Sequence, residues 1–373
     1  MTAGRLERYV PFVGESVVEE LRLLGARLRG RRILNVNSTA VGGGVAEILT
    51  RMVPLLQELG LDARWDVIKG GERFFAVTKK MHNALHNRKE EFTQADFDLF
   101  LATNAENALE LDLQADVVFI HDPQPIGLVA RRGEVGGRWL WRCHIDFSNP
   151  QESVWQFLKP FIERYDAAVF SAPAFARALA LRQIFIAPSI DPLSDKNRDL
   201  TEPEIAGVFE RFGIDRSRPV LTQISRFDYL KDPVGVIQAY RMVKPRQDCQ
   251  LVLAGGGATD DPEGAQVLAE VREAAGNDPD IRILLLPPAS DLEINALQRG
   301  STIVLQKSLH EGFGLTVAEA LWKSKPVMAG AVGGIPLQIA HEFSGLLSHT
   351  IEGTAAHIRR LLRDPEEAAR LGR

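Results

Sequence analysis

The sequence predicts an α/β protein made of two doubly wound domains, each built around a parallel sheet. The chain has 373 residues, 45% of them hydrophobic, and a domain usually holds about 100 to 200 residues. Short apolar runs rich in β-branched residues recur between amphipathic stretches, which is typical of parallel strands covered by helices. Several of these runs end in polar or turn residues, where open α/β sheets bind ligands.

The predicted strands are short apolar segments bounded by turn residues. Eight of them are 33–36, 117–120, 167–170, 220–224, 251–254, 281–286, 303–305 and 327–329, and a further strand is WLWRC, which precedes His144. Between Pro188 and Pro219 the chain becomes polar and proline-bearing, as a linker would. We therefore expect an N-terminal domain of residues 1–205 and a C-terminal domain of residues 206–373.

Composition excludes several classes of protein. The net charge of -5 offers no general attraction to nucleic acid or to an anionic membrane. No segment approaches the roughly 18 uninterrupted apolar residues of a membrane helix, and the N-terminus lacks a signal-type apolar core. Cys143 and Cys249 lie one in each half and suggest neither a disulfide framework nor a metal cage. We expect a cytoplasmic protein without nucleic-acid or membrane partners and without a metal.

The segment EGFGLTVAE follows a predicted strand and opens a helix near Leu315. Gly312 and Gly314 free the backbone there, and a helix N-terminus with exposed N–H groups is an anion site suited to a diphosphate. A plain strand-to-helix turn is the alternative interpretation. Glu311 lies in the loop and Glu319 in the helix, about 12 Å apart by helical rise. That separation exceeds what a pair of glycosidase carboxyl groups needs, so the two glutamates are predicted to bind different parts of one ligand.

A second cluster is the segment SRFDYLKDP, in which Arg226 leaves a strand and Lys231 follows five residues later. An arginine can bind phosphate oxygens with two donors while a lysine supplies a point charge, so this pair would neutralise a diphosphate leaving group. The alternative is a surface salt bridge to Asp228 or Asp232.

The N-terminal half contains a strand, a glycine loop and a helix in NVNSTAVGGGVAEIL. Gly42, Gly43 and Gly44 let the backbone approach a ligand closely, but their spacing is not G-x-G-x-x-G, so dinucleotide binding is only a secondary hypothesis. Two further strands deliver His121 with Asp122, and His144 with Asp146, to loops. Each histidine fits a structural hydrogen-bond partner as well as it fits a catalytic group.

Together these residues resemble family GT4 of retaining glycosyltransferases, which have the GT-B fold of two Rossmann-like domains facing a central cleft. The E-x7-E element from Glu311 to Glu319 is that family's most specific motif. The strings NSTAVGGGVAEIL, IHDPQP, WRCHIDFS, SRFDYLKDP and HEGFGLTVAEALWK are similar to those of its trehalose synthase and trehalose phosphorylase group. The family usually ends in a helix that crosses back to the N-terminal domain, and we expect that helix to be absent or incomplete here.

The resemblance implies a role for each motif residue of the C-terminal half. Arg226 and Lys231 would bind the donor diphosphate and act in catalysis, Glu311 would contact the donor sugar, and Glu319 would bind the ribose hydroxyls. Backbone N–H groups for the donor would come from the loop and first helical turn, namely Gly312, Phe313, Gly314, Leu315 and Thr316.

In the N-terminal half, His144 matches a catalytic-site histidine that touches the donor sugar. Asp122 matches an aspartate that holds acceptor hydroxyls, and Asp146 is a second candidate for binding substrate. The glycine loop would close over them, with Gly42 near the substrate and Gly43 and Gly44 near the donor.

The implied reaction transfers glucose reversibly from a nucleoside-diphosphate glucose to free glucose, giving α,α-trehalose with the donor's configuration retained. No cofactor or metal is implied, and ADP-, UDP- and GDP-glucose all remain open as donors. The alternatives are a retaining trehalose phosphorylase and, in another class, a sugar-nucleotide-binding module without turnover. A homodimer is the common prior for the assembly.

Overall fold

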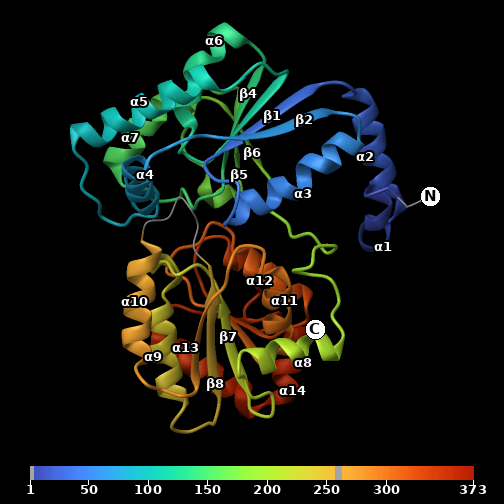
Figure 1. Cartoon of the computed structure of the whole chain (residues 1–373), viewed down its shortest axis with the longest axis vertical. Helices are drawn as coiled ribbons and strands as arrows, with labels where there is room; N and C mark the ends of the chain where they lie inside the picture. The colour runs from blue at the N-terminus through green and yellow to red at the C-terminus, as the bar shows by residue number, and fades with distance from the viewer. Residues whose placement is uncertain (1–3, 257–262) are drawn as a thin grey trace. The chain divides into compact units, whose positions relative to one another are not determined.

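The computed structural model describes residues 4–256 and 263–373, and the chain divides into two compact units. The first unit ends at Pro188 and the second begins at Ser189. Each unit contains one six-stranded sheet in which every recorded strand pair is parallel (Figure 1).

The sheet of the first unit has the strand order β2-β1-β3-β4-β5-β6. Its strands are β1 (Arg32–Asn37), β2 (Asp62–Val67), β3 (Val117–His121), β4 (Arg138–Cys143), β5 (Ala167–Phe170) and β6 (Arg182–Phe185). The central strands β3, β4 and β5 carry continuous or nearly continuous apolar residues because helices cover both faces of the sheet.

The helices of the first unit lie on the two faces of this sheet (Figure 1). They are α1 (Val10–Val13), α2 (Glu15–Arg27), α3 (Gly44–Glu58), α4 (Glu72–Leu85), α5 (Gln94–Glu110), α6 (Arg132–Val135) and α7 (Glu152–Ile162). Helices α4, α5 and α7 enclose the main core, in which Phe74, Phe100 and Trp141 are fully or almost fully buried. Helix α3 covers the opposite face and contacts β1 and β2.

The sheet of the second unit has the order β12-β11-β10-β7-β8-β9. Its strands are β7 (Val220–Ile224), β8 (Gln250–Gly255), β9 (Ile281–Leu285), β10 (Ile303–Gln306), β11 (Val327–Gly330) and β12 (Leu346–Ser348). Alternate residues of the strands face opposite sides: Leu221 packs in one hydrophobic cluster, and its neighbour Val220 packs in another.

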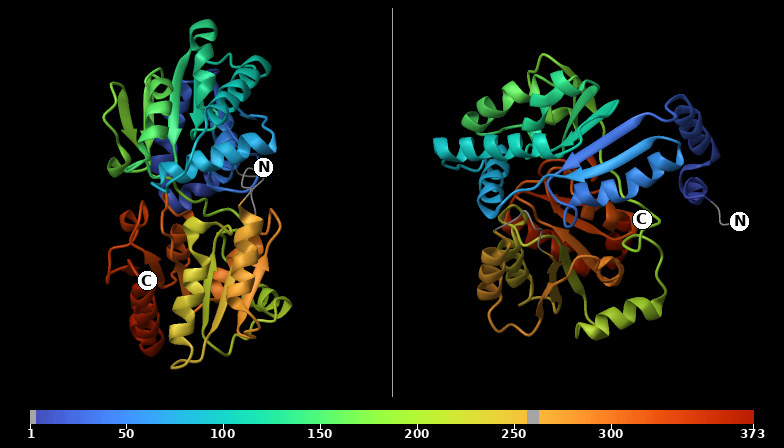
Figure 2. Two further views of the ribbon diagram at one scale, coloured as in Figure 1. Left: turned by 90° about the vertical axis from the view of Figure 1, so that its left-hand side faces the viewer. Right: turned by 45° about the horizontal axis from the view of Figure 1, so that its top comes forward.

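Helices of the second unit cover both faces of its sheet (Figure 2). They are α8 (Glu202–Arg211), α9 (Pro233–Val243), α10 (Gly264–Ala275), α11 (Asp291–Gly300), α12 (Leu315–Trp322), α13 (Ile351–Arg363) and α14 (Pro365–Gly372). Helices α9, α10, α13 and α14 share one apolar cluster, whereas α8 with α11, and α12, pack on two others. No described helix is long and apolar enough to span a bilayer.

Each sheet has a point where the strand order reverses direction. In the first unit this point lies between β1 and β3, and in the second it lies between β7 and β10. Helix connections leave to opposite sides at such a point, so the carboxyl ends of the two strands border a crevice that binds ligands in open α/β sheets. The glycine loop follows β1, and His121 is the last residue of β3. In the second unit, Arg226 follows β7 and the EGFG segment follows β10.

The structure confirms all nine predicted strands to within two residues at either end. Sequence analysis missed β2, β6 and β12, which do not present an uninterrupted apolar run. The strand β2 reads DARWDV, with two aspartates in six residues, and its burial is mostly partial. An edge strand tolerates such charged residues because one of its sides has no neighbouring strand. The charges interrupt the apolar run by which strands were predicted.

The boundary between the units lies at Pro188 and Ser189 rather than at residue 205. The reason is that the polar segment that follows Ser189 packs on the second unit. Asn295 on α11 donates its side-chain N–H groups to the carbonyls of Asp195 and Arg198, both at 2.8 Å. These bonds fix the linker residues to the domain that follows them. The last helix, α14, also belongs to the second unit, where Leu371 is buried in its core.

Candidate functional site

In the second unit, the two strands at the reversal of strand order carry the predicted phosphate-binding residues. β7 ends at Ile224 and is followed by Arg226, after which a short 3-10 turn at Tyr229–Lys231 precedes α9. Asp232 begins α9 in the left-handed region, with φ of 47°, and its Oδ1 accepts from Gly235 N at 3.0 Å. This cap fixes the chain direction immediately after Lys231.

Lys231 forms an ion pair with Glu311, which joins the two predicted motifs. The Lys231 Nζ atom lies 2.6 Å from Glu311 Oε2, and both side chains are largely buried. The same carboxylate oxygen accepts from Ser308 Oγ at 3.1 Å and from Gln306 Nε2 at 3.4 Å. An ion pair with this many donors holds its geometry, because burial raises the cost of separating the charges.

The alternative interpretation was a salt bridge to Asp228 or Asp232. Arg226 forms such a pair, whereas Lys231 pairs with Glu311. The Arg226 Nη2 atom lies 3.5 Å from Asp228 Oδ2, whose side chain is buried. Asp232 instead pairs with Lys307, a cation that sequence analysis did not single out. Lys307 N also donates to Gln223 Oε1 at 2.9 Å, so this lysine is fixed beside the end of β7.

The loop after Glu311 and the start of α12 match the prediction. Helix α12 begins at Leu315, and Gly314 precedes it in the left-handed region with φ of 86°. Thr316 Oγ1 donates to Gln306 Oε1 at 3.0 Å and ties the first helical turn to the end of β10. The amide groups of residues 312–316 therefore lie at the N-terminal end of a helix, where donors remain available for an anion.

A glycine pair that sequence analysis missed lies against this loop. A Cβ atom on Gly333 would be 1.6 Å from Glu311 O, and one on Gly334 would be 2.6 Å from Gly312 O. Gln338 Nε2 donates to Phe313 O at 2.5 Å on the same side. The segment after β11 therefore supports the EGFG loop. The sequence feature that could have indicated this close contact is the pair of consecutive glycines shortly after a predicted strand.

Glu319 lies in the second turn of α12 and is fully buried. Its Oε1 atom is 3.2 Å from Lys196 Nζ, and its Oε2 atom accepts from Gln298 Nε2 at 3.3 Å. Lys196 comes from the segment that follows Ser189, so the linker reaches the helix that carries the second glutamate. Sequence analysis had no signal for this pairing, because Lys196 follows neither a strand nor a glycine loop.

In the first unit, the glycine loop between β1 and α3 forms as predicted. Gly42 and Gly43 adopt positive φ values of 75° and 120°, which L-residues with side chains rarely take. Helix α3 starts at Gly44. Asn37 Nδ2 donates to Thr39 O at 2.7 Å and orders the entrance of the loop.

Asp122 and Asp146 shape the loops after β3 and β4. Asp122 has φ of 63°, and its Oδ1 accepts from His144 N at 2.7 Å, so it connects the ends of the two strands. Asp146 Oδ1 accepts from Ser148 N at 3.0 Å and closes a local turn. Both carboxylates thus support the backbone around His144, and their binding of substrate stays a prediction.

His121 and His144 contact each other at the ends of these strands. His121 Nδ1 lies 3.1 Å from His144 Nε2, and His121 Nε2 lies 3.1 Å from Asn35 Oδ1 on β1. Burial, with a smaller effect from the nearby Arg142 guanidinium, lowers the pKa of His121 to about 3. Desolvation, then His121 and Arg142, holds the pKa of His144 well below its usual value. Both imidazoles are therefore neutral near pH 7.

These depressed pKa values predict that the protein loses stability on mild acidification. The unfolded chain binds protons on both histidines as pH falls below about 6.5, while the folded chain keeps them neutral, so unfolding becomes easier. The effect of His121 is absent above its unfolded pKa and grows as pH falls toward 3, at up to about 1.4 kcal/mol per pH unit. Urea unfolding at pH 7.5, 6 and 5 measures it. We expect a shallower pH slope for His121→Gln than for wild type, and equal slopes would contradict this account.

Other aromatic and histidine side chains of the first unit lie in its interior. Trp139 and Trp141 are fully buried. On α4, His86 is buried, and its ring is in edge contact with that of His82. Among the described residues, no group of three or more His, Cys, Asp or Glu is placed to hold a metal ion.

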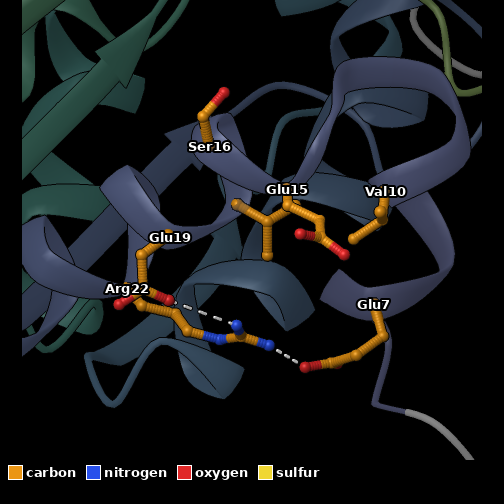
Figure 3. A pocket seen from close by; sticks show the side chains of 7 residues that line it. Glu7, Val10, Glu15, Ser16, Glu19 and Arg22 are labelled. Carbon is orange, nitrogen blue, oxygen red and sulfur yellow. Dashed lines mark hydrogen bonds and ion pairs between the residues drawn. The ribbon is translucent and has the colours of Figure 1, made fainter.

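A hollow of about 510 Å³ lies apart from these strand ends, between the N-terminal helices (Figure 3). Arg22 crosses it and pairs with Glu7 and, at 3.5 Å, with Glu19. None of the predicted site residues lines it. The hollow is therefore separate from the residues predicted to bind the donor and the acceptor.

Comparisons with known proteins show to which family the chain belongs. Residues 35–177 match the family model described as trehalose synthase, N-terminal domain, and residues 207–373 match that of glycosyl transferases group 1. Trehalose synthase of Rubrobacter xylanophilus is 44% identical over 379 residues, and that of Pyrococcus horikoshii is 43% identical over 374 residues. Each alignment covers 99% of this chain and 90% of the relative. The solved structure of the trehalose-6-phosphate synthase OtsA superposes with a TM-score of 0.73 at 16% identity, covering 91% of this chain and 93% of that one.

The two sheets, the family models and the structural neighbour define the class of protein, a glycosyltransferase with the GT-B fold. Within that class the chain belongs to the trehalose synthase family. The resemblance found in the sequence is thereby confirmed at the level of fold and family.

Proposed function

We propose that the protein transfers glucose from a nucleoside-diphosphate glucose to the anomeric hydroxyl of free glucose and forms α,α-trehalose with retention. The observation that carries this proposal is the Lys231–Glu311 pair at the reversal point of the second sheet, 2.6 Å apart beside the N-terminus of α12. This arrangement offers a cation and backbone donors for a diphosphate together with a carboxylate for sugar hydroxyls. Membership of the trehalose synthase family supports the choice of sugars.

In the proposed reaction the donor's own phosphate replaces a protein base. The bond between the sugar's C1 and the phosphate oxygen breaks, and the acceptor oxygen forms its bond to C1 from the same face. The acceptor's proton passes to the leaving phosphate oxygen. Arg226 and Lys231 stabilise the negative charge that grows on the diphosphate, which is how preorganised cations accelerate such a step. We propose no metal, since the two cations supply the needed positive charge.

The remaining site residues have proposed roles in binding. Glu311 accepts hydroxyl groups of the donor sugar, and Glu319 accepts those of the ribose, where the Lys196 ammonium now lies 3.2 Å from its carboxylate. His144 contacts the donor sugar, while Asp122 and Asp146 hold the acceptor. Gly42, Gly43 and Gly44 provide a loop that can approach the sugars without side chains in the way.

Calorimetric titration tests the donor site independently of turnover. We expect ADP, UDP or GDP to bind and to compete with the matching sugar nucleotide, because the site is proposed to extend from diphosphate to ribose. Binding of inorganic phosphate alone, with none of the nucleotides, would favour a trehalose phosphorylase instead. Tight nucleotide binding without any transfer to glucose would favour a binding module.

Substitution of Glu319 is expected to weaken donor binding more than it slows the chemical step. Glu319→Ala removes a charged acceptor of ribose hydroxyls, which costs about 1.5 to 3 kcal/mol, or roughly 10- to 150-fold in affinity. Glu293→Ala on α11, which removes a more exposed glutamate paired with Arg211, is the matched control and should leave the affinity unchanged. Nucleotide titrations measure both, and equal affinities for the two variants would remove Glu319 from the donor site.

A further inference from the structure

The hydrogen bonds around His121 have only one consistent assignment of donors and acceptors. Asn35 is fully buried on β1, and its Nδ2 donates to Arg64 O at 3.4 Å. A flipped amide would bring the Asn35 oxygen against that carbonyl oxygen, which has no hydrogen to give. Asn35 Oδ1 therefore faces His121 Nε2 at 3.1 Å and can only accept. His121 must carry its proton on Nε2.

The proton position on His121 determines the one on His144. A neutral imidazole protonated at Nε2 has a lone pair at Nδ1, and His121 Nδ1 lies 3.1 Å from His144 Nε2. His144 must then donate from Nε2, which leaves Nδ1 of His144 as an acceptor. No other group in the described part of the chain hydrogen-bonds this Nδ1 atom, so it is available to a ligand. The low pKa values of both rings keep the arrangement neutral.

We propose that Asn35 is a positioning residue that acts through His121 to fix His144 as the Nε2–H tautomer, with Nδ1 ready to accept a sugar hydroxyl. The inference rests on the proposed contact between His144 and the donor sugar. It means that the sugar group recognised there must be a hydrogen-bond donor. Asn35 interrupts the apolar residues of β1 (RILNVN), where a valine or leucine would suffice for packing. Fixing the proton on His121 accounts for an amide at this position.

The tautomer can be read directly in the free protein by NMR. Long-range proton–nitrogen correlation spectra of ¹⁵N-histidine-labelled protein distinguish protonated from unprotonated ring nitrogens, and His121→Gln and His144→Gln variants assign the signals among the eight histidines. In wild type we expect His121 and His144 to be neutral Nε2–H tautomers at pH 7. Any other state of His144 would overturn the proposal, whether or not the protein transfers glucose.

Variants at Asn35 and His121 separate positioning from mere packing. Asn35→Asp places a carboxylate on His121 Nε2–H, which favours a doubly protonated His121 and reverses the tautomer of His144. We expect that reversal, and a tenfold or greater loss of kcat/KM with the fold unchanged by circular dichroism. His121→Gln keeps a donor toward Asn35 and an acceptor toward His144, so it should preserve the His144 tautomer, whereas His121→Leu should not. A His144 tautomer that is the same in all variants would show that Asn35 does not set it.

Discussion

Lys231→Ala is expected to lower kcat for glucose transfer by about 100- to 1,000-fold, because removal of one preorganised donor to a developing negative charge typically costs that much. The ammonium lies 2.6 Å from Glu311 Oε2 at the reversal point of the second sheet. Its loss leaves the diphosphate less well neutralised and leaves Glu311 without its cation. Steady-state kinetics with a saturating donor measure the effect on kcat.

Stability has to be separated from catalysis in this variant. Breaking one side of a buried ion pair can cost about 3 to 5 kcal/mol, so unfolding by urea should accompany the kinetics. Lys244→Ala is the matched control: this lysine pairs with Asp248 and Asp280 elsewhere in the same unit. It should keep kcat within a few-fold. Transfer by Lys231→Ala that stays within a few-fold of wild type would show that the diphosphate does not bind here.

Gly333→Ala is expected to destabilise the second unit by about 2 to 5 kcal/mol and to abolish most of the activity. The added Cβ atom would lie 1.6 Å from the carbonyl oxygen of Glu311, and the residue has φ of 54°. Overpacking contributes about 1 to 3 kcal/mol, and the left-handed backbone about 1 to 2 kcal/mol. Relief of the clash requires the loop that carries Glu311 to move, which would disturb the pair with Lys231.

The control for this substitution isolates the clash from the backbone strain. Gly276→Ala has a similar φ of 61° but meets no atom within 4 Å. It should cost only the backbone strain of a positive φ, about 1 to 3 kcal/mol, and leave kcat unchanged. Urea unfolding and kinetics of the two variants measure the difference. Equal losses of stability would mean that the contact with Glu311 O is relieved without consequence.

Much of the fold followed from hydrophobic patterning, since the central strands are buried on both faces and carry nearly continuous apolar runs. The motif residues that directly follow those strands could also be placed, because parallel strands present their carboxyl ends at one edge. Arg226, Lys231 and Glu311 were found this way. The edge strand β2 was not predicted because its two aspartates interrupt the apolar pattern.

The pairings inside the site could not be derived from sequence, because they join segments that are distant along the chain. Lys196, in the linker, pairs with Glu319. Lys307 pairs with Asp232, one of the two aspartates considered as salt-bridge partners in the sequence. Asn35 was detectable in principle, since a buried strand rarely carries an asparagine without a hydrogen-bond partner. What no pattern revealed is that its partner is His121, and through it His144.

The most direct test of the proposed reaction is NMR analysis of the product made from nucleoside-diphosphate [1-¹³C]glucose and unlabelled glucose. With ADP-, UDP- or GDP-glucose as donor, we predict a single labelled disaccharide, α,α-trehalose, formed together with the free nucleoside diphosphate and with the labelled carbon in the α configuration. The absence of trehalose with all three donors, or a labelled carbon of β configuration, would contradict the account.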